Sequence, residues 1–140
     1  DGHVDTVSVI DLTVEPPRVI DRIAIGDAPE GLAISPTGKI AVAILLKGSA
    51  GVPTESWFYN RNGSVVVLAI DGKSVTRVGE VEVRGLPEGV VFSADGSHLY
   101  VGNFVDADVS ILEVDGTTVT NTGRTLSLPG TPGSMGSSQP

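Results

Sequence analysis

The sequence has no cysteine, a single tryptophan and only two histidines among its 140 residues. Without cysteine there is no disulfide, no thiolate nucleophile and no zinc site built on cysteine. The histidines, His3 and His98, leave little for a histidine-rich metal site. The sequence also lacks an apolar run close to the roughly 20 residues of a membrane-spanning helix, so we expect no membrane insertion.

Basic residues are scarce, with 9 Lys and Arg against 17 Asp and Glu, which gives a formal net charge of -8. A surface of that sign disfavours nucleic acid and anionic lipid as partners. Hydrophobic residues make up 40% of a chain that also carries 18 glycines and 9 prolines. This composition predicts one small, turn-rich, all-β domain.

One segment of the sequence returns along the chain. Residues 28–38, APEGLAISPTG, reappear at 86–96 as LPEGVVFSADG, and TPGSM at 131–135 begins a third copy. The proline of each copy recurs after 58 and then 45 positions. The shorter interval matches the roughly 40–45 residues of a β-propeller blade.

A second element repeats in phase with the first, an alternating apolar run that ends in aspartate. In two copies the run ends in Asp-Gly, at 71–72 and 115–116, a strong signal for a β-hairpin. One repeat read from residue 85 predicts strands at about 89–93, 98–103, 109–114 and 119–128, listed here in chain order. Four antiparallel strands per repeat indicate a β-propeller of four-stranded blades.

About two and a half blades are expected. Residues 1–25 supply half a blade, 26–84 a blade with a long loop at 47–63, 85–129 a second blade, and 130–140 the start of a next blade or a tail. Propellers close with four to eight blades. The remaining blades are therefore expected from the same longer protein, which we favour, or from another copy of the chain.

The stretch 87–103, PEGVVFSADGSHLYVGN, resembles the YVTN-type propeller repeat, with its Pro-x-Gly, a Ser-Pro-Asp-Gly-like turn and Leu-Tyr-Val-x-Asn. The earlier copy is degenerate, with IAVA at 40–43. The resemblance implies a propeller like those of bacterial surface-layer and periplasmic proteins, with lactonase-like relatives and a periplasmic or extracellular location. It also implies that Tyr100 and Asn103 serve packing and backbone pairing.

Two glutamates hold the same repeat position at the entrance of the innermost strand. Glu30 and Glu88 are expected to point to one mouth of a propeller channel. There they could act as acid and base in a lactonase, or bind a divalent cation such as calcium with further ligands from other blades. Solvated rim glutamates are the simpler interpretation, which we favour because the third copy has Gly133 at this position.

The long loop at 47–63 contains half of the six aromatic residues, Trp57, Phe58 and Tyr59. Loops on a rigid scaffold often carry binding residues. These rings are thus candidates for contact with a small-molecule or protein ligand, or they pack on their own blade and cover its edge. The residues alone do not favour either interpretation.

Other polar patterns predict turns rather than sites. Asp106 and Asp108 could suggest calcium ligands, but they lack the glycine and distal glutamate of an EF-hand loop, so a polar turn is favoured. Asn62-Gly63 before a valine run predicts a turn into a strand. The sequence has no nucleophile elbow, P-loop or His-Glu-x-x-His motif.

These observations predict a non-catalytic binding or scaffold module of an exported bacterial protein, without a cofactor. The alternative is part of a lactonase-like propeller hydrolase with a carboxylate or metal site at the channel mouth. A nucleic-acid-binding propeller is a third class, which the net charge disfavours.

Overall fold

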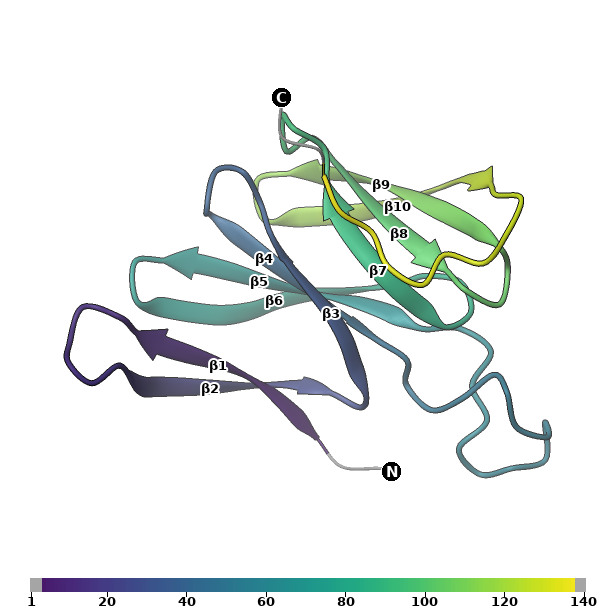
Figure 1. The fold of residues 1–140 in the computed structure, drawn as a ribbon, viewed down its shortest axis with the longest axis horizontal. Coiled ribbons are helices and arrows are strands. Elements are labelled where there is room, and N and C mark those ends of the chain that lie inside the picture. The colour runs from purple at the N-terminus through teal and green to yellow at the C-terminus, as the bar shows by residue number, and fades with distance from the viewer. Residues whose placement is uncertain (1–3, 138–140) are drawn as a thin grey trace.

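A computed structural model of the protein describes residues 4–137 as ten β-strands without a helix (Figure 1). The strands are β1 (Asp5–Asp11), β2 (Arg18–Gly26), β3 (Pro29–Ile34), β4 (Ile40–Leu45), β5 (Ser64–Asp71), β6 (Ser74–Glu82), β7 (Pro87–Phe92), β8 (His98–Asn103), β9 (Asp108–Asp115) and β10 (Thr118–Ser127). Nothing in the described part of the chain has the length and apolar character of a membrane-spanning helix.

The strands form three sheets, each of which follows the order of the chain. A two-stranded hairpin, β1-β2, precedes the four-stranded sheets β3-β4-β5-β6 and β7-β8-β9-β10. Neighbouring strands are antiparallel throughout. The prediction of an all-β chain with antiparallel four-stranded sheets is thereby confirmed.

The two Asp-Gly pairs form the hairpin turns between β5 and β6 and between β9 and β10. Gly72 and Gly116 both have a φ of 59°, a left-handed conformation that costs glycine little. A side chain with a Cβ would strain either turn. The same local chemistry therefore ends the third strand of both sheets.

The centre of the β3–β6 sheet, β4 and most of β5, is buried on both faces, because β4 alternates between two cores. Ile40, Val42 and Ile44 pack in one cluster with Leu99 and Leu112 of the β7–β10 sheet. The intervening residues of β4 pack toward the β1-β2 hairpin in a second cluster, which consists of Ile25, Ala41, Ala43, Leu45, Val66 and Leu68. This arrangement explains why β4 is apolar at every position.

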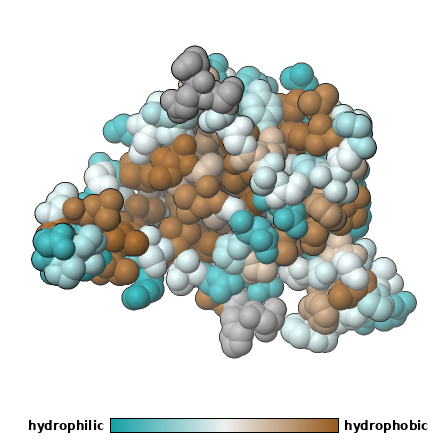
Figure 2. Space-filling view, in the orientation of Figure 1, coloured by the Kyte–Doolittle hydropathy of each residue, from teal (hydrophilic) through white to brown (hydrophobic). Residues whose placement is uncertain are grey.

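One apolar face is left open beside the hairpin. Leu32 and Ile34 of β3 are 51% and 58% exposed, and Ile10 of β1 is 53% exposed. An apolar hollow of about 230 Å³ separates these strands, and Figure 2 shows apolar side chains gathered over the hairpin and the middle of the molecule. Among the described residues, β1 pairs with β2 alone, so its outer edge carries no strand.

The segment after β10 runs back across β7 and β8 without forming a strand (Figure 1). A Cβ on Gly89 would lie 2.8 Å from Cγ of Met135, and one on Gly31 would lie 3.6 Å from Cγ1 of Val90. Met135 holds the place in the third repeat that Val90 holds in the second. The tail thus repeats the contact that β7 makes with β3.

Candidate functional site

Both repeat glutamates lie at one edge of the sheets. The antiparallel register places the start of β3 beside the end of β4, where the loop 47–63 leaves the sheet. The start of β7 lies at the same edge, beside the end of β8. We call this edge, with Glu30, Glu88 and the loop 47–63, the loop edge; the structure brings these predicted site residues to it together.

The two glutamates are positioned by the same backbone turn. Each follows by two residues a non-glycine residue in the left-handed region, Ala28 and Leu86, both with a φ of 54°. The carbonyls of these residues accept hydrogen bonds from the backbone N–H groups of Leu46 and Phe104, each at 3.0 Å. Such strained residues persist only where neighbouring structure holds them. Glu30 is exposed and Glu88 is half-buried.

The loop 47–63 closes on itself through a backbone neck. Ser49 N–H donates to the carbonyl of Phe58 at 3.0 Å, and Asn60 N–H donates to the carbonyl of Ser49 at 3.1 Å. Gly48 has a φ of 99°, and a Cβ there would lie 2.3 Å from the Phe58 carbonyl oxygen. Only glycine fits this position without displacing the backbone, so the neck depends on it.

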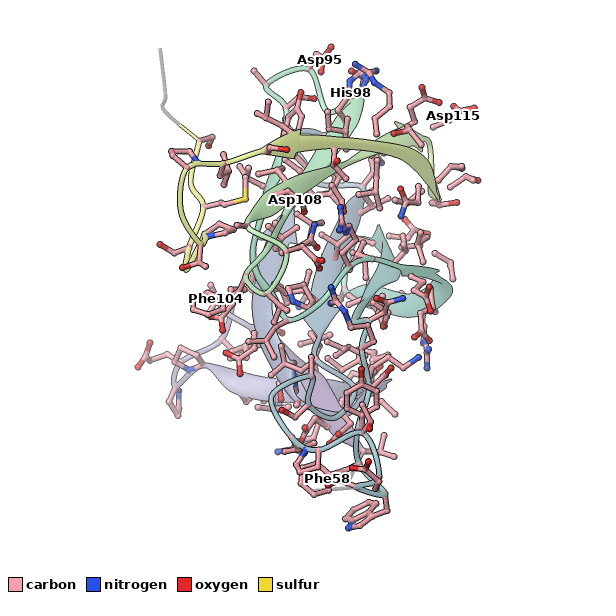
Figure 3. All side chains as sticks on the ribbon, turned by 90° about the vertical axis from the view of Figure 1, so that its right-hand side faces the viewer. Phe58, Asp95, His98, Phe104, Asp108 and Asp115 are labelled. Atoms are coloured by element: carbon pink, nitrogen blue, oxygen red, sulfur yellow. The ribbon has the colours of Figure 1, made fainter. Side chains whose placement is uncertain are left out.

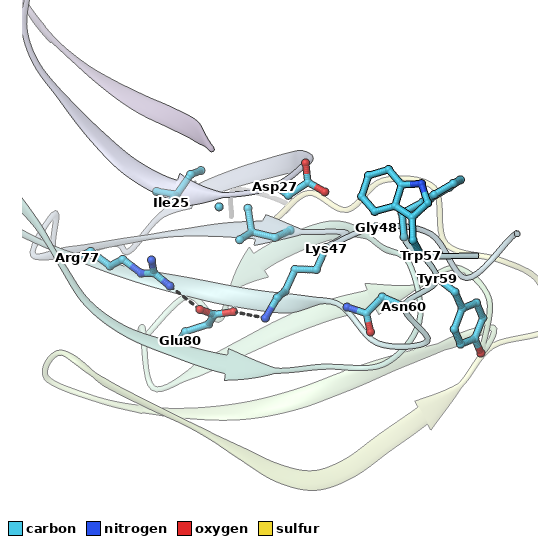
Figure 4. A pocket seen from close by; sticks show the side chains of 12 residues that line it. Ile25, Asp27, Lys47, Gly48, Trp57, Tyr59, Asn60, Arg77 and Glu80 are labelled. Carbon is cyan, nitrogen blue, oxygen red and sulfur yellow. Dashed lines mark hydrogen bonds and ion pairs between the residues drawn. The ribbon is translucent and has the colours of Figure 1, made fainter. Parts of the chain in front are cut away.

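The aromatic residues of the loop remain largely in solvent. Trp57 is 80% exposed and Phe58 is 39% exposed. Their rings meet edge to face with centroids 5.3 Å apart, while Tyr59 is half-buried. All three line a cavity of about 410 Å³ beside β2, β4 and β6 (Figure 4). The structure therefore places these rings at a cavity rather than in the core.

A carboxylate bridges two cations in the same cavity. Glu80 accepts a 2.8 Å hydrogen bond from Lys47 Nζ with Oε1, and its Oε2 accepts from Arg77. The hydrogen bond from Lys47 lowers the pKa of Glu80 below its usual range, against the opposing effect of burial. Glu80 is therefore ionised at neutral pH.

A second ionic cluster ties the loop edge together at the predicted polar turn. Burial raises the pKa of Asp106, but hydrogen bonds from Arg61 and the Gly85 N–H outweigh it and lower that pKa overall. Arg84 binds Asp106 at 2.9 Å and also pairs with Asp108. The turn is as predicted, but both arginines were missed because no local pattern connects them with the aspartates.

Asn103 is the buried member of this ionic cluster. Its side chain is fully buried, and Nδ2 donates to Asp108 Oδ1 at 2.7 Å and to Ser110 Oγ at 2.9 Å. The sequence resemblance implied packing and backbone pairing for this asparagine. The structure adds a side-chain role, because Asn103 orients the carboxylate that pairs with Arg84.

The described histidine lies away from the loop edge. Figure 3 shows His98 and Asp95 at the opposite end of the molecule from Phe58. His98 stacks on Tyr100 with ring centroids 6.4 Å apart, and its Nδ1 is 2.8 Å from Ser97 Oγ. Ser97 in turn donates to Asp95. His3 lies outside the described residues.

Residues 4–137 contain no group of three or more His, Cys, Asp or Glu side chains placed to hold a metal ion. Calcium takes six to eight oxygen ligands. Glu30 and Glu88 would form only part of such a set, so the calcium alternative stays a prediction that depends on ligands from further blades.

Acid should destabilise the protein progressively below about pH 4. Hydrogen bonds from Lys73 and Thr13 hold the pKa of Asp11 at about 2, and bonds from Ser93 and Ser97 hold that of Asp95 at about 2. An unfolded aspartate titrates near 3.9, so these groups stabilise the fold above that pH and cease to do so as pH falls through about 2.

Urea unfolding midpoints between pH 7 and pH 2 measure this loss. A double variant, Asp11→Asn with Asp95→Asn, should start less stable at pH 7 and show a flatter dependence below pH 4. Equal slopes for the two proteins would contradict the assignment of acid sensitivity to these carboxylates.

Comparison with known proteins bears on the fold. No family model and no curated protein matches the sequence. A structure from Bacteroides fragilis, assigned as a 6-phosphogluconolactonase, superposes with a TM-score of 0.75 at 17% identity, over 92% of this chain and 35% of that one. A periplasmic gluconolactonase from Pseudomonas aeruginosa gives 0.60 at 16%, over 81% and 32%.

These likenesses correct the main functional prediction. The expected non-catalytic binding or scaffold module does not agree with them, because both solved structures are described as lactonases. The hydrolase alternative is left as a proposal. At these identities the likeness establishes the fold, and the chain shares that fold with lactonases over about a third of their length.

Proposed function

We propose that this chain is part of a lactonase-like β-propeller hydrolase whose active site includes the two glutamates of the loop edge, Glu30 and Glu88. The observation that carries the proposal is the fold likeness to a structure assigned as a 6-phosphogluconolactonase, which extends over 92% of the chain. Fold alone does not determine chemistry. The placement of Glu30 and Glu88 at one edge supplies the functional groups.

The open surfaces support a ring completed by further blades. In a four-stranded blade the hairpin β1-β2 would be the outer half, and the inner half would cover the exposed Leu32 and Ile34. The tail at 131–137 supports a further blade beside β7. Met135 packs against Gly89 of β7 as Val90 packs against Gly31 of β3. The remaining blades are proposed to come from the same longer protein.

Lactone hydrolysis requires groups that Glu30 and Glu88 can provide. A carboxylate takes a proton from water, the oxygen of that water adds to the lactone carbonyl, and the ring C–O bond breaks. The departing alkoxide takes a proton and a hydroxy acid results. We assign the base to the half-buried Glu88, because partial exclusion of water strengthens its interaction with the attacking water.

An exported location accompanies this proposal. The periplasmic gluconolactonase from Pseudomonas aeruginosa and the resemblance of 87–103 to surface-layer repeats both support it. Fractionation of the source cells, with detection of the natural protein outside the inner membrane, tests it; recovery with the cytoplasmic fraction would contradict it.

The activity is tested on the natural polypeptide that carries residues 1–140. Proton release from D-glucono-1,5-lactone and its 6-phosphate is followed in a pH-stat. Glu88→Gln should lower kcat by about 100-fold or more, and Glu30→Gln should also lower it, because loss of an acid or base typically costs that much. The matched control is Glu113→Gln. Glu113 is exposed and lies opposite His98 in the register of β8 and β9, at the end of the molecule away from the loop edge.

Two results would overturn the proposal. The first is no turnover of either lactone above the uncatalysed rate. The second is turnover that both glutamine variants retain in full, which would move the chemistry away from the loop edge.

A further inference from the structure

The cavity beside the aromatic loop is distinct from the glutamate pair. It lies where β2 ends and where β4 leads into the loop, with β6 as its outer wall (Figure 4). Neither Glu30 nor Glu88 lines it. Its apolar floor includes Ile25 and Leu45, each 1% exposed. The cavity therefore has a rigid base that the core holds in place.

The charges that line this cavity balance. Lys47 and Arg77 supply two cations, and Glu80 and Asp27 supply two carboxylates. The chain as a whole has a formal charge of -8, so no excess of positive charge attracts an anion here. Beyond their bonds to Glu80, the ammonium and guanidinium groups have further N–H donors. This composition suits a neutral ligand that carries many hydroxyl groups.

The rings add an apolar surface at the mouth of the cavity. Trp57 and Phe58 remain 80% and 39% exposed, and the neck at Gly48 holds their loop in place. A large aromatic surface left in water beside a cavity is a common feature of binding sites. The C–H face of a pyranose ring matches such a surface, while its hydroxyl groups match the charged wall.

We propose that this cavity binds a neutral pyranose sugar, with Trp57 as the stacking platform and Lys47, Arg77 and Glu80 as hydrogen-bonding groups. Its volume of about 410 Å³ lies at the small end of the roughly 300–1,000 Å³ typical of ligand pockets. That size fits one or two sugar rings. The site goes beyond the proposed lactonase activity and holds a saccharide at the loop edge, apart from Glu30 and Glu88, without reacting with it.

The experiment uses the only tryptophan of the chain as its reporter. Because Trp57 is that residue, its emission during a titration of the 140-residue chain with cellobiose reports on this cavity alone. A saturable change in emission is expected. Isothermal calorimetry should show that Trp57→Ala and Lys47→Met each weaken cellobiose binding by about tenfold or more, equivalent to about 1.4 kcal/mol.

Two controls separate the site from folding and from catalysis. Phe104→Ala removes an aromatic residue that is 38% exposed and does not line the cavity, so it should leave affinity unchanged. Glu30→Gln should also keep full affinity, which distinguishes this site from the proposed active site. Circular dichroism and the urea midpoint verify that each variant is folded.

Absence of both an emission change and binding heat at millimolar cellobiose would overturn the proposal. So would tighter binding of 6-phosphogluconate than of cellobiose, because that would show an anion site. Equal weakening by Phe104→Ala would also contradict it.

Discussion

Replacement of Asn103 by aspartate should lower the free energy of unfolding by about 3–5 kcal/mol, the range for disruption of buried charged networks. Asn103 is fully buried and donates from Nδ2 to Asp108 and Ser110. Asn103→Asp removes both donors and sets a second carboxylate against that of Asp108. The adjoining ion pair of Asp108 with Arg84 is expected to loosen as well.

Urea unfolding at pH 7 measures this loss, with a fall in Tm of about 10 °C or more as a second readout. The matched control is Asn121→Asp, an exposed asparagine that gives one hydrogen bond to the carbonyl of Glu82; it should cost less than about 1 kcal/mol. If Asn103→Asp costs no more than the control, the asparagine does not organise the cluster.

Gly63→Ala should cost about 3 kcal/mol, the upper end for overpacking in a close-packed interior. A Cβ on Gly63 would lie 2.4 Å from Cδ of Pro87 and 2.5 Å from the carbonyl oxygen of Leu45. The backbone of Gly63 is also fixed by hydrogen bonds with Arg84 and Val83. Because a proline ring and a carbonyl cannot rotate away, the two four-stranded sheets must separate at this point.

Gly130→Ala is the control for this change. A Cβ on Gly130 would meet nothing within 4 Å, so its effect should stay within about 0.5 kcal/mol. Both variants are compared by thermal and urea unfolding. A cost for Gly63→Ala below about 1 kcal/mol would mean that β5 and β7 approach less closely than the structure shows.

Local chemistry made much of the fold predictable. The Asp-Gly pairs at 71–72 and 115–116 favour a hairpin turn through their own backbone preferences, which do not depend on distant residues. The structure places both pairs in hairpin turns. A turn at Asn62-Gly63 leading into a strand was also predicted from local preference; β5 does begin at Ser64, but residues 62–63 form no turn. The tight contact of Gly63 with Pro87 was not predicted, because that contact depends on how two sheets pack.

The only part of the candidate site that the sequence predicted is the part whose residues recur in the repeat. Glu30 and Glu88 recur at one repeat position, so their common edge follows from the repeat. The cavity could not be foreseen, because Trp57 and Glu80 line it together only through the placement of the loop relative to β6. Its one sequence signal was the cluster of aromatic residues in an inserted loop.

The functional prediction was wrong for a related reason. The repeat motif in 87–103 consists of residues that build turns and strands, so it indicates architecture and not chemistry. Lactonase-like relatives entered only through the resemblance of that motif to a propeller repeat, and the solved structures that share the fold are described as lactonases.

The burial of both faces at the centre of the β3–β6 sheet has a consequence for synthesis of the chain. The core on one face includes Leu112 and Val119, which leave the ribosome well after β3–β6 is complete. Chains generally fold by domains as they emerge. In this chain the β3–β6 sheet has one apolar face exposed to solvent until β7–β10 has been synthesised. The interval in which the nascent chain is prone to aggregate is therefore set by the synthesis of β7–β10, residues 87–127, at typical rates of elongation.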